Sequence, residues 1–284
     1  MELTLRPAEA GDVAEGLVAD APQFGDVAAR HGFPPDLPSV EVATALIGAV
    51  VGSGQSWSVV AEREGRLVGS NFMSFEASVA GIGPVTVDPV AQDGGAGKAM
   101  MLAALAEAEQ RHVASVRLVQ AAYHARSLSL YAKLGFDPQE PLVQLTGAVH
   151  DQPSGTTVRR ARAGDRPACD RLCTEVHGHD RGRALAQAIE ARSAVVVERD
   201  GEISGYATSV DFIGHAVARS NTDLEALIAG AGPPRRGGFL LPVRNAELFR
   251  WCLGQGLRVV QPMTLMSTGL YREPKGAFLP SVLY

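Results

Sequence analysis

The feature that most constrains this chain is a strand, a glycine-rich turn and a helix that follow one another from Gly83 to Lys98, GPVTVDPVAQDGGAGK. The continuation KAMMLAALAEAEQR is dense in the residues that favour helices most. Gly94, Gly95 and Gly97 stand where this helix begins, and the first backbone N–H groups of a helix have no intrahelical partner. Glycines lack Cβ atoms and the helix dipole is positive at this end, so an anion can approach closely. The stretch therefore predicts a pyrophosphate site.

Two common nucleotide motifs are excluded by the residues of this turn. A P-loop needs a glycine five residues before Gly97 and a Ser or Thr after Lys98, but the chain has Gln92 and Ala99 there. The dinucleotide fingerprint G-x-G-x-x-G is also absent. An ordinary glycine-rich connection between a strand and a helix stays open as the alternative.

Two motifs together resemble the GNAT acetyltransferase superfamily. The first is Q-x-x-G-x-G from Gln92 to Gly97, which follows V-D-P and resembles the acetyl-CoA-binding motif. The second, YHARSLSLYAKLGFDP, resembles the signature N-x-x-A-x-x-L-Y-x-x-x-G-F. Its positions are filled by His124, Ser127, Leu130, Tyr131, Gly135 and Phe136, with His in place of Asn and Ser in place of Ala. The resemblance covers roughly residues 2–147.

The residues around these motifs predict alternating strands and helices. Stretches rich in β-branched residues, bounded by turn residues, predict strands. The expected strands are Leu3–Leu5, Ser56–Glu62, Arg66–Glu76, Ile82–Val87 and Val116–Ala122. A helix is expected from Asp12, as N-cap, to about Ala19, and a second one after Ser39.

The chain repeats itself after a polar linker at 147–157. AEAGD at 8–12 returns as ARAGD at 161–165, and AEREGRLVG at 61–69 returns as VERDGEISG at 197–205. Asn245, Gly256 and Leu257 repeat the spacing of His124, Gly135 and Phe136, and PLVQLTG at 141–147 returns as QPMTLMSTG at 261–269. Echoes in the same order predict a duplicated domain. We expect an α/β fold, a mixed sheet flanked by helices, with two GNAT-like domains in tandem at 1–147 and 156–284.

The second copy lacks the glycine-rich turn. It is shorter between its hairpin and its last glycine, and GHAVARSNTDLEALIAGAG stands where the motif would be. Asn221 or Thr222 is expected to be a plain helix N-cap there, and Cys252 occupies the position of Tyr131. The chain from RNAELFRWC to the tail resembles the C-terminal domain of tandem-GNAT proteins. The resemblance therefore implies a degenerate second domain that completes the acceptor pocket or the fold.

The resemblance implies transfer of an acetyl group from acetyl-CoA to an amine, by direct attack of the amine. It implies that pantetheine lies along the fourth strand, where a backbone N–H polarises the thioester carbonyl, and that the turn holds the pyrophosphate. The cofactor-binding residues expected are Val85, Thr86, Val87, Gln92, Asp93, Gly94, Gly95, Ala96, Gly97, Lys98, His124 and Ser127. A direct contact of Lys98 with phosphate and a solvated Lys98 are left as equal alternatives.

The expected catalytic residues are Tyr131 and Glu76. The resemblance places the Tyr131 hydroxyl near the sulfur as the acid that protonates the departing thiolate; the alternative is an aromatic side chain that only packs. A primary amine with a pKa near 10.4 is only about 0.04% neutral at pH 7, so its proton must be removed. Glu76 is the nearest carboxylate to the fourth strand, and a solvated residue at a strand end is its alternative.

The composition limits the partners. Lys plus Arg number 26 and Asp plus Glu 31, a net charge of −5 without basic clusters, which argues against nucleic acid. The chain has no apolar run of about 18 residues and no secretion signal, so we expect no membrane partner. Three cysteines, Cys169, Cys173 and Cys252, favour a reducing cytoplasm and a place in the core. A homodimer stays open.

The remaining cluster, His177-Gly178-His179-Asp180, has no matching third-ligand motif. It is expected to end or kink the helix that begins at Asp165, and no metal is predicted. The function expected from all of these features is an acetyl-CoA-dependent N-acetyltransferase, with a non-catalytic acyl-CoA-binding or regulatory protein as the alternative.

Overall fold

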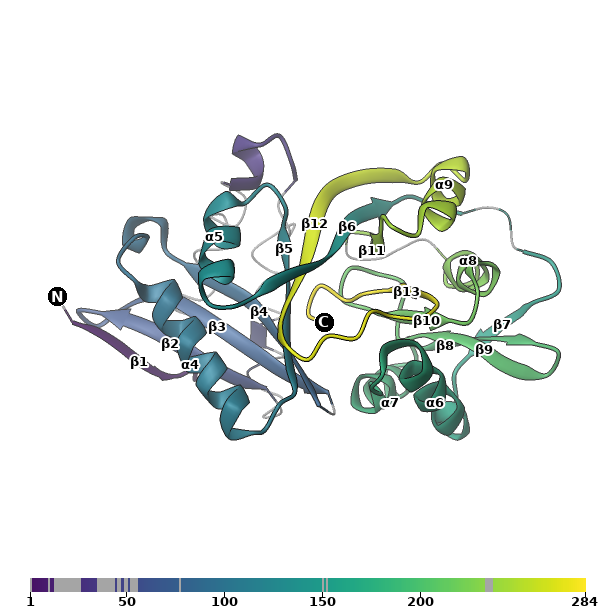
Figure 1. The fold of residues 1–284 in the computed structure, drawn as a ribbon, viewed down its shortest axis with the longest axis horizontal. Coiled ribbons are helices and arrows are strands. Elements are labelled where there is room, and N and C mark those ends of the chain that lie inside the picture. The colour runs from purple at the N-terminus through teal and green to yellow at the C-terminus, as the bar shows by residue number, and fades with distance from the viewer. Residues whose placement is uncertain are drawn as a thin grey trace.

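The structure, a computed structural model, describes residues 2–9, 11–12, 27–34, 44, 47–48, 51, 56–76, 78–149, 151, 153–232 and 237–284. The helix expected from Asp12 to about Ala19 and the one expected after Ser39 lie outside these residues, apart from a few positions. Figure 1 shows two α/β halves beside each other, with the N-terminus at the far end of the first half and the C-terminus between the halves.

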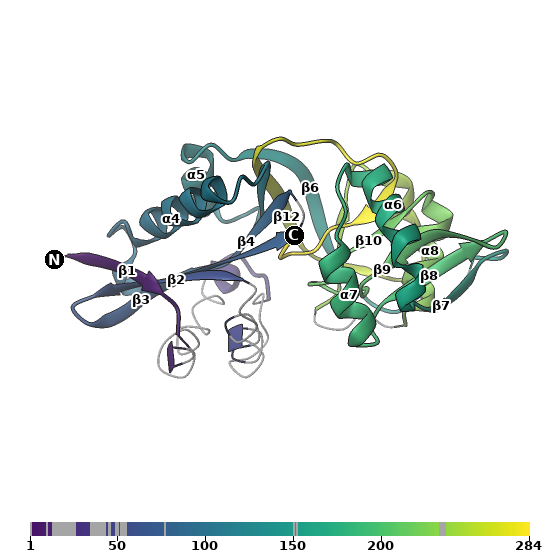
Figure 2. The same ribbon diagram turned by 90° about the horizontal axis from the view of Figure 1, so that it is seen from below.

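The first half is a twisted sheet covered on one face by two helices, α4 and α5 (Figure 2). Its strands are β1 (Leu3–Pro7), β2 (Trp57–Arg63), β3 (Arg66–Glu76), β4 (Val79–Val87), β5 (Ser115–Ala121) and β6 (Asp137–Thr146). Its helices are η1 (Pro89–Ala91), α4 (Ala96–Gln110) and α5 (Ala125–Lys133). The predicted strands are confirmed in place, and β4 begins three residues earlier than expected.

The second half repeats this order around a smaller sheet. Its strands are β7 (Thr157–Arg160), β8 (Val195–Arg199), β9 (Glu202–Ala207), β10 (Ala216–Ala218), β11 (Phe239–Pro242), β12 (Arg258–Gly269) and β13 (Ala277–Leu279). Its helices are η2 (Ala163–Asp165), α6 (Arg166–His177), α7 (Gly182–Glu190), α8 (Asn221–Gly230) and α9 (Ala246–Gly254). The buried side chains of α6 and α7 pack on one face of β8–β10, and those of α8 and α9 pack on the other.

The two halves share strands. One sheet has the order β1-β2-β3-β4-β5-β12-β6-β11 and the other β13-β10-β9-β8-β7. Strand β12 of the second half thus lies between β5 and β6 of the first, antiparallel to both, as the centre of Figure 1 shows. The two echoed segments at 141–147 and 261–269 lie side by side, with Val143 opposite Pro262. One sheet therefore contains strands from both sides of the linker at 147–157.

The echo of AEAGD in ARAGD has a structural counterpart. In the first half the Arg6 guanidinium binds Asp12 and Glu62, each at 2.7 Å. In the second half Arg159 binds Asp165 and Glu198 in the same way, at 2.8 and 2.5 Å. Each aspartate also accepts a backbone N–H three residues earlier, at 2.7 Å in both halves. The same cluster therefore fastens the first strand to the hairpin in each copy.

The prediction of one helix end is confirmed, and the prediction of one helix start was wrong. Helix α6 ends at His177, where Gly178 has a left-handed φ of 82°, as the HGHD segment predicts. Helix α8, by contrast, is capped by Ser220 and not by Asn221 or Thr222, because the Ser220 Oγ accepts the Asp223 N–H at 3.2 Å. All three cysteines are free and buried, as expected. Among the described helices, none has the length and apolar character needed to cross a membrane.

Candidate active site

The candidate site opens where β4 and β5 part. The two strands pair in parallel only where Val79–Gly81 of β4 lie beside Ser115–Arg117 of β5. Beyond that point β4 stays on β3, with a shift of register between Met73↔Ile82 and Asn71↔Val85. Gly83 and Pro84 there stand opposite the single residue Phe72, an insertion of one residue in β4. Proline has no N–H to donate to a neighbouring strand, so it suits this break in the ladder. A cavity results between the separated ends of the two strands.

Beyond the insertion, β4 turns backbone donors toward this gap. The Asp88 N–H bonds the Val68 carbonyl of β3 at 2.9 Å. Because N–H groups alternate in direction along an antiparallel strand, those of Val85 and Val87 point away from β3. The edge of β4 that borders the cavity therefore offers hydrogen bonds to an extended ligand.

The predicted anion cradle lies at the mouth of the gap. Gly95 precedes α4 with a φ of 84°, and no side chain caps the helix start. A Cβ on Gly97 would lie 3.4 Å from Val87 Cγ2, an ordinary contact, so the start of α4 lies against β4. The groove beside them has a volume of about 620 Å³. Backbone N–H groups at this helix start are thus available to an anion.

The expected cofactor residues gather around two adjoining cavities, with one exception. Residues that line the groove are Val85, Val87, Gln92, Asp93, Gly95, Ala96, Gly97, Lys98, His124 and Ser127. Thr86 lines the inner cavity. Gly94 lines neither cavity; its carbonyl accepts a hydrogen bond from Arg63 at 2.9 Å, and a Cβ there would meet the same guanidinium at 2.5 Å. Gly94 therefore lies against the Arg63 side chain.

Arg126 at the groove was not expected from the sequence. This residue of α5 binds the Asp93 carboxylate at 2.7 Å and the Gln92 amide oxygen. It therefore ties the first turn of α5 to the glycine-rich turn and places a positive charge beside the cradle. The only signal in the sequence was its position two residues after His124, inside the second motif.

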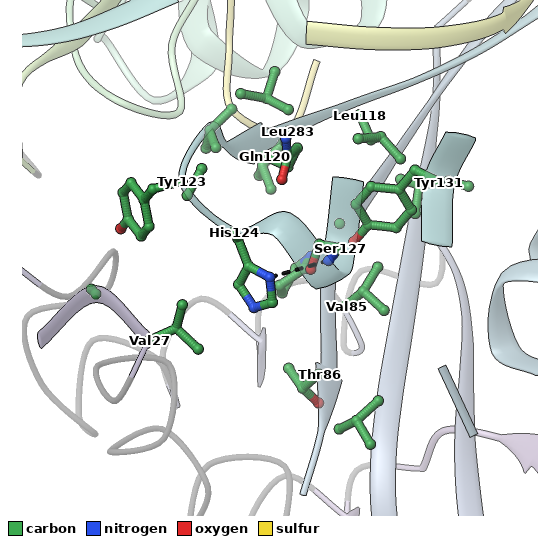
Figure 3. Close-up of a pocket in the computed structure, with 18 of the residues that line it drawn as sticks. Val27, Val85, Thr86, Leu118, Gln120, Tyr123, His124, Ser127, Tyr131 and Leu283 are labelled. Carbon is green, nitrogen blue, oxygen red and sulfur yellow. Dashed lines mark hydrogen bonds between the residues drawn. The ribbon is translucent and has the colours of Figure 1, made fainter. Parts of the chain in front are cut away.

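Tyr131 stands where the two cavities meet, because it lines both of them. Only 8% of the residue is exposed. Burial raises the pKa of its hydroxyl to about 12, and a hydrogen bond with Ser127 opposes this shift. The hydroxyl is therefore protonated at neutral pH, as a proton donor must be. Figure 3 shows the ring at one side of the cavity with its oxygen toward Ser127.

His124 begins α5. Its Nδ1 accepts the Ser127 N–H at 3.1 Å, which is the dashed line in Figure 3, so the side chain caps the helix. Because Nδ1 accepts this bond, the proton of the neutral ring is on Nε2. The capping contact holds the ring at the junction of the two cavities.

The inner cavity, of about 240 Å³, is lined in part by the second half of the chain. Phe212 and Ile213 from the loop after β9 line it, together with Val282 and Leu283 from the C-terminal segment. They line the cavity together with residues of β5 and with Gly83 and Pro84. The second half therefore contributes a wall of the site, in addition to strand β12.

Glu76 lies away from both cavities. It ends β3, opposite Val79, and does not line either cavity. Burial raises the pKa of its carboxyl, and the nearby Arg181 charge and the N–H of Ala184 in α7 oppose this shift. Its environment is thus the contact between β3 and α7. Among the described residues that line the inner cavity, there is no carboxylate.

The second half has no open counterpart of this gap among its described residues. Strands β10 and β11 occupy the positions of β4 and β5, but β13 pairs antiparallel with β10, Ala216 opposite Leu279, and also contacts β11. The chain's own strand therefore fills the place that stays open in the first half. No group of three or more His, Cys, Asp or Glu side chains placed to hold a metal ion occurs in the described part of the chain.

Comparisons with known proteins agree with this geometry. Residues 34–136 match the acetyltransferase (GNAT) family. No curated protein sequence matches the chain. A Pyrococcus horikoshii protein described as an acetyltransferase has a similar structure, with a TM-score of 0.72 and 19% identity over 97% of this chain and 94% of that one.

Two further structures extend over nearly the whole chain. A GCN5-related N-acetyltransferase from Sphaerobacter thermophilus has a TM-score of 0.60 and 16% identity, over 95% of this chain and 96% of that one. A tandem GNAT protein from the clavulanic acid biosynthesis pathway has a TM-score of 0.58 and 13% identity, over 94% of this chain and 98% of that one. At these identities the likeness concerns the fold. The expectation of two GNAT-like domains in tandem is confirmed.

Proposed function

We propose, from the premise that residues 34–136 form a GNAT-family domain, that this protein is an N-acetyltransferase that uses acetyl-CoA and an amine. We further propose that the first half carries the reaction. The observation that supports this most is the junction at Tyr131. There the groove at the glycine-rich turn meets the inner cavity, and both are bordered by the free edge of β4.

The residues of the groove would hold acetyl-CoA in three places. The N–H groups at the start of α4, from Ala96 to Lys98, would bind the pyrophosphate. Arg126 and Lys98 would add positive charge. Arg126 would bind the pyrophosphate either in place of the Asp93 carboxylate or together with it. The N–H groups of Val85 and Val87 would bind the pantetheine arm as a neighbouring strand would.

The inner cavity would bring the amine to the thioester. A β4 backbone N–H would hold the thioester carbonyl oxygen, whose negative charge grows as the amine attacks. When the tetrahedral adduct collapses, the C–S bond breaks and the Tyr131 hydroxyl gives its proton to the departing thiolate. The nitrogen of the new amide loses its extra proton to water, and the Tyr131 phenolate takes a proton back from water. The high pKa of this hydroxyl keeps the proton available at neutral pH.

The structure gives the expected base role of Glu76 no support, because this residue faces α7. We therefore propose that the acceptor enters as the neutral amine or loses its proton to water in the cavity. A larger fraction of a weakly basic amine is neutral at pH 7. We therefore expect weakly basic amines to react faster than strongly basic ones at equal concentration.

The test is thiol release from acetyl-CoA across a panel of amines. We expect release that depends on the amine and that falls strongly in Tyr131→Phe. A protein that binds acetyl-CoA but releases thiol with no amine in the panel would favour the alternative of a non-catalytic acyl-CoA-binding protein.

A further inference from the structure

One buried side chain of the inner cavity has no hydrogen-bond partner among the residues that the structure describes. Gln120 lies on β5, beyond the last residue that pairs with β4, and only 6% of it is exposed. Its Oε1 and its Nε2 are both buried, and neither has a hydrogen-bond partner in the described part of the chain. Figure 3 shows this side chain within the cavity wall. A buried amide without partners is unfavourable for the folded protein, so its retention here needs a reason.

Two other buried glutamines show how this fold satisfies an amide. Gln261, 1% exposed, accepts the Tyr123 hydroxyl at 2.7 Å and donates to Gln144 Oε1 at 2.8 Å. Gln144, 4% exposed, donates in turn to the Gly237 carbonyl at 2.6 Å. These amides form a chain that joins the strands around β12 and β6. Gln120, on the neighbouring strand, is outside this chain.

The position of Gln120 separates it from the path expected for pantetheine. Among the described residues, six line both cavities and so mark the passage between them: Val85, Val87, Gln92, His124, Ser127 and Tyr131. Gln120 lines only the inner cavity, as do Phe212 and Leu283 of the second half. The donors expected to serve pantetheine, moreover, belong to β4, across the gap from β5. Gln120 therefore lies on the side of the cavity where the acceptor would lie.

The chemistry of the side chain selects a partner. A glutamine amide offers one acceptor oxygen and two N–H donors, and exchanging the two ends leaves this set unchanged. A cationic group would satisfy only the oxygen, and a carboxylate would satisfy only the N–H groups. An amide group, which carries a donor and an acceptor side by side, satisfies both.

We propose that Gln120 binds an amide group of the acceptor, so that the preferred substrates are small amines with a carboxamide or peptide amide next to the amine. This inference rests on the proposed acetyl transfer. It assigns Gln120 to substrate recognition and leaves the transfer step to the groups around Tyr131.

The test compares two acceptors of nearly equal shape, glycinamide and isobutylamine, in the full-length protein and in Gln120→Met. Methionine keeps the length of the side chain without its polar atoms. In the wild type we expect a higher kcat/KM for glycinamide. In Gln120→Met, kcat/KM for glycinamide should fall by about 10-fold or more, and that for isobutylamine should change by less than about 3-fold. Taking the ratio of variant to wild type for each amine cancels the different basicities of the two amines.

Three controls separate the alternatives. Leu118→Met, a substitution on the same face of β5, should change kcat/KM by the same factor for both amines. Titration of acetyl-CoA by calorimetry should give the same Kd in Gln120→Met and in the wild type; a weaker Kd would overturn the inference by assigning Gln120 to pantetheine. The melting temperature of Gln120→Met should stay equal or rise, because an unpartnered amide is removed. A clear drop would show that the amide has a structural partner and would also overturn the inference.

The remaining outcomes are equally decisive. Equal losses for both amines, no loss for either, or no transfer to glycinamide by a protein that acetylates isobutylamine would each contradict the amide site and leave acetyl transfer intact. Binding of acetyl-CoA without transfer to either amine would contradict the inference as well. A wild-type protein without affinity for acetyl-CoA would contradict the proposed function itself.

Discussion

His124 in the first half and Asn245 in the second make the same contact. The His124 Nδ1 accepts the backbone N–H of Ser127 at 3.1 Å, and the Asn245 Oδ1 accepts that of Leu248 at 3.3 Å. Each side chain therefore caps the helix that follows the fifth strand of its half. Since Asn is the residue that the GNAT signature has here, the substitution by His preserves the cap.

This contact predicts that His124→Asn leaves the stability of the protein unchanged and that His124→Ala lowers it. The Ala variant loses the acceptor for one N–H of α5, which should cost about 1 kcal/mol in the free energy of unfolding. Denaturant unfolding measures this difference. An Asn variant as unstable as the Ala variant would show that His124 acts through other contacts of its ring.

Tyr131→Phe should lower kcat by roughly 10² to 10⁴, the usual contribution of a general acid, with little change in the Kd of acetyl-CoA. The ring that packs in the core is kept, so the fold should be kept as well. Since burial raises the pKa of the hydroxyl to about 12, wild-type activity should show no loss from deprotonation of Tyr131 between about pH 7 and pH 10. Steady-state kinetics over this range are the measurement, and full activity of Tyr131→Phe would remove the proposed acid.

Gly95 and Gly65 allow a matched test of the cradle. Both have left-handed backbones, with φ of 84° and 74°, and a Cβ on either would meet no atom within 4 Å. Gly95→Ala and Gly65→Ala should therefore lose similar stability, about 1 kcal/mol each. Only Gly95→Ala should weaken acetyl-CoA binding, because Gly65 lies in the turn between β2 and β3. Equal Kd values in the two variants would count against the cradle.

The protein should lose stability as the pH falls from about 6.5 to about 4. Burial and neighbouring positive charge lower the pKa of His179 to about 4, and burial also lowers the pKa values of His177 and His215. In the unfolded chain these rings take up protons near pH 6.5, and in the folded chain they do so only at lower pH. Acidification therefore favours the unfolded chain, and the stability present above pH 6.5 is lost through this window.

Urea unfolding at a series of pH values measures this loss. His179 alone accounts for up to about 3 kcal/mol, by the conversion of 1.36 kcal/mol per pKa unit. His179→Asn should make the stability curve flatter over this window. An unchanged slope in the variant would mean that His179 does not remain neutral in the folded protein.

The sequence predicted the local features of this fold well. The hairpin β2–β3, the strand before the glycine-rich turn and the end of α6 depend on short-range signals such as β-branched runs and glycines with positive φ. The order of echoes predicted the duplication, which the clusters around Arg6 and Arg159 reproduce in space. The strand, turn and helix around the proposed cradle were predictable as well, because their residues are consecutive.

Long-range pairing could not be predicted in the same way. Strand β12 enters the sheet of the first half, and β13 fills the gap of the second half. Both strands pair with partners more than 50 residues away. An apolar pattern such as that of Met263–Met266 predicts a strand but does not indicate which strand it pairs with. The surroundings of Glu76 could not be predicted for the same reason, because its neighbours Arg181 and Ala184 belong to the other half.

The central claim is that one half of the chain binds acetyl-CoA and the other half cannot. Calorimetric titration of the full-length protein with acetyl-CoA, repeated with Gly95→Glu, tests this claim most directly. We predict one molecule bound per chain in the wild type and none in the variant, whose side chain would stand in a left-handed turn at the cradle. No binding by the wild type, two molecules per chain, or unchanged binding by Gly95→Glu would contradict the account.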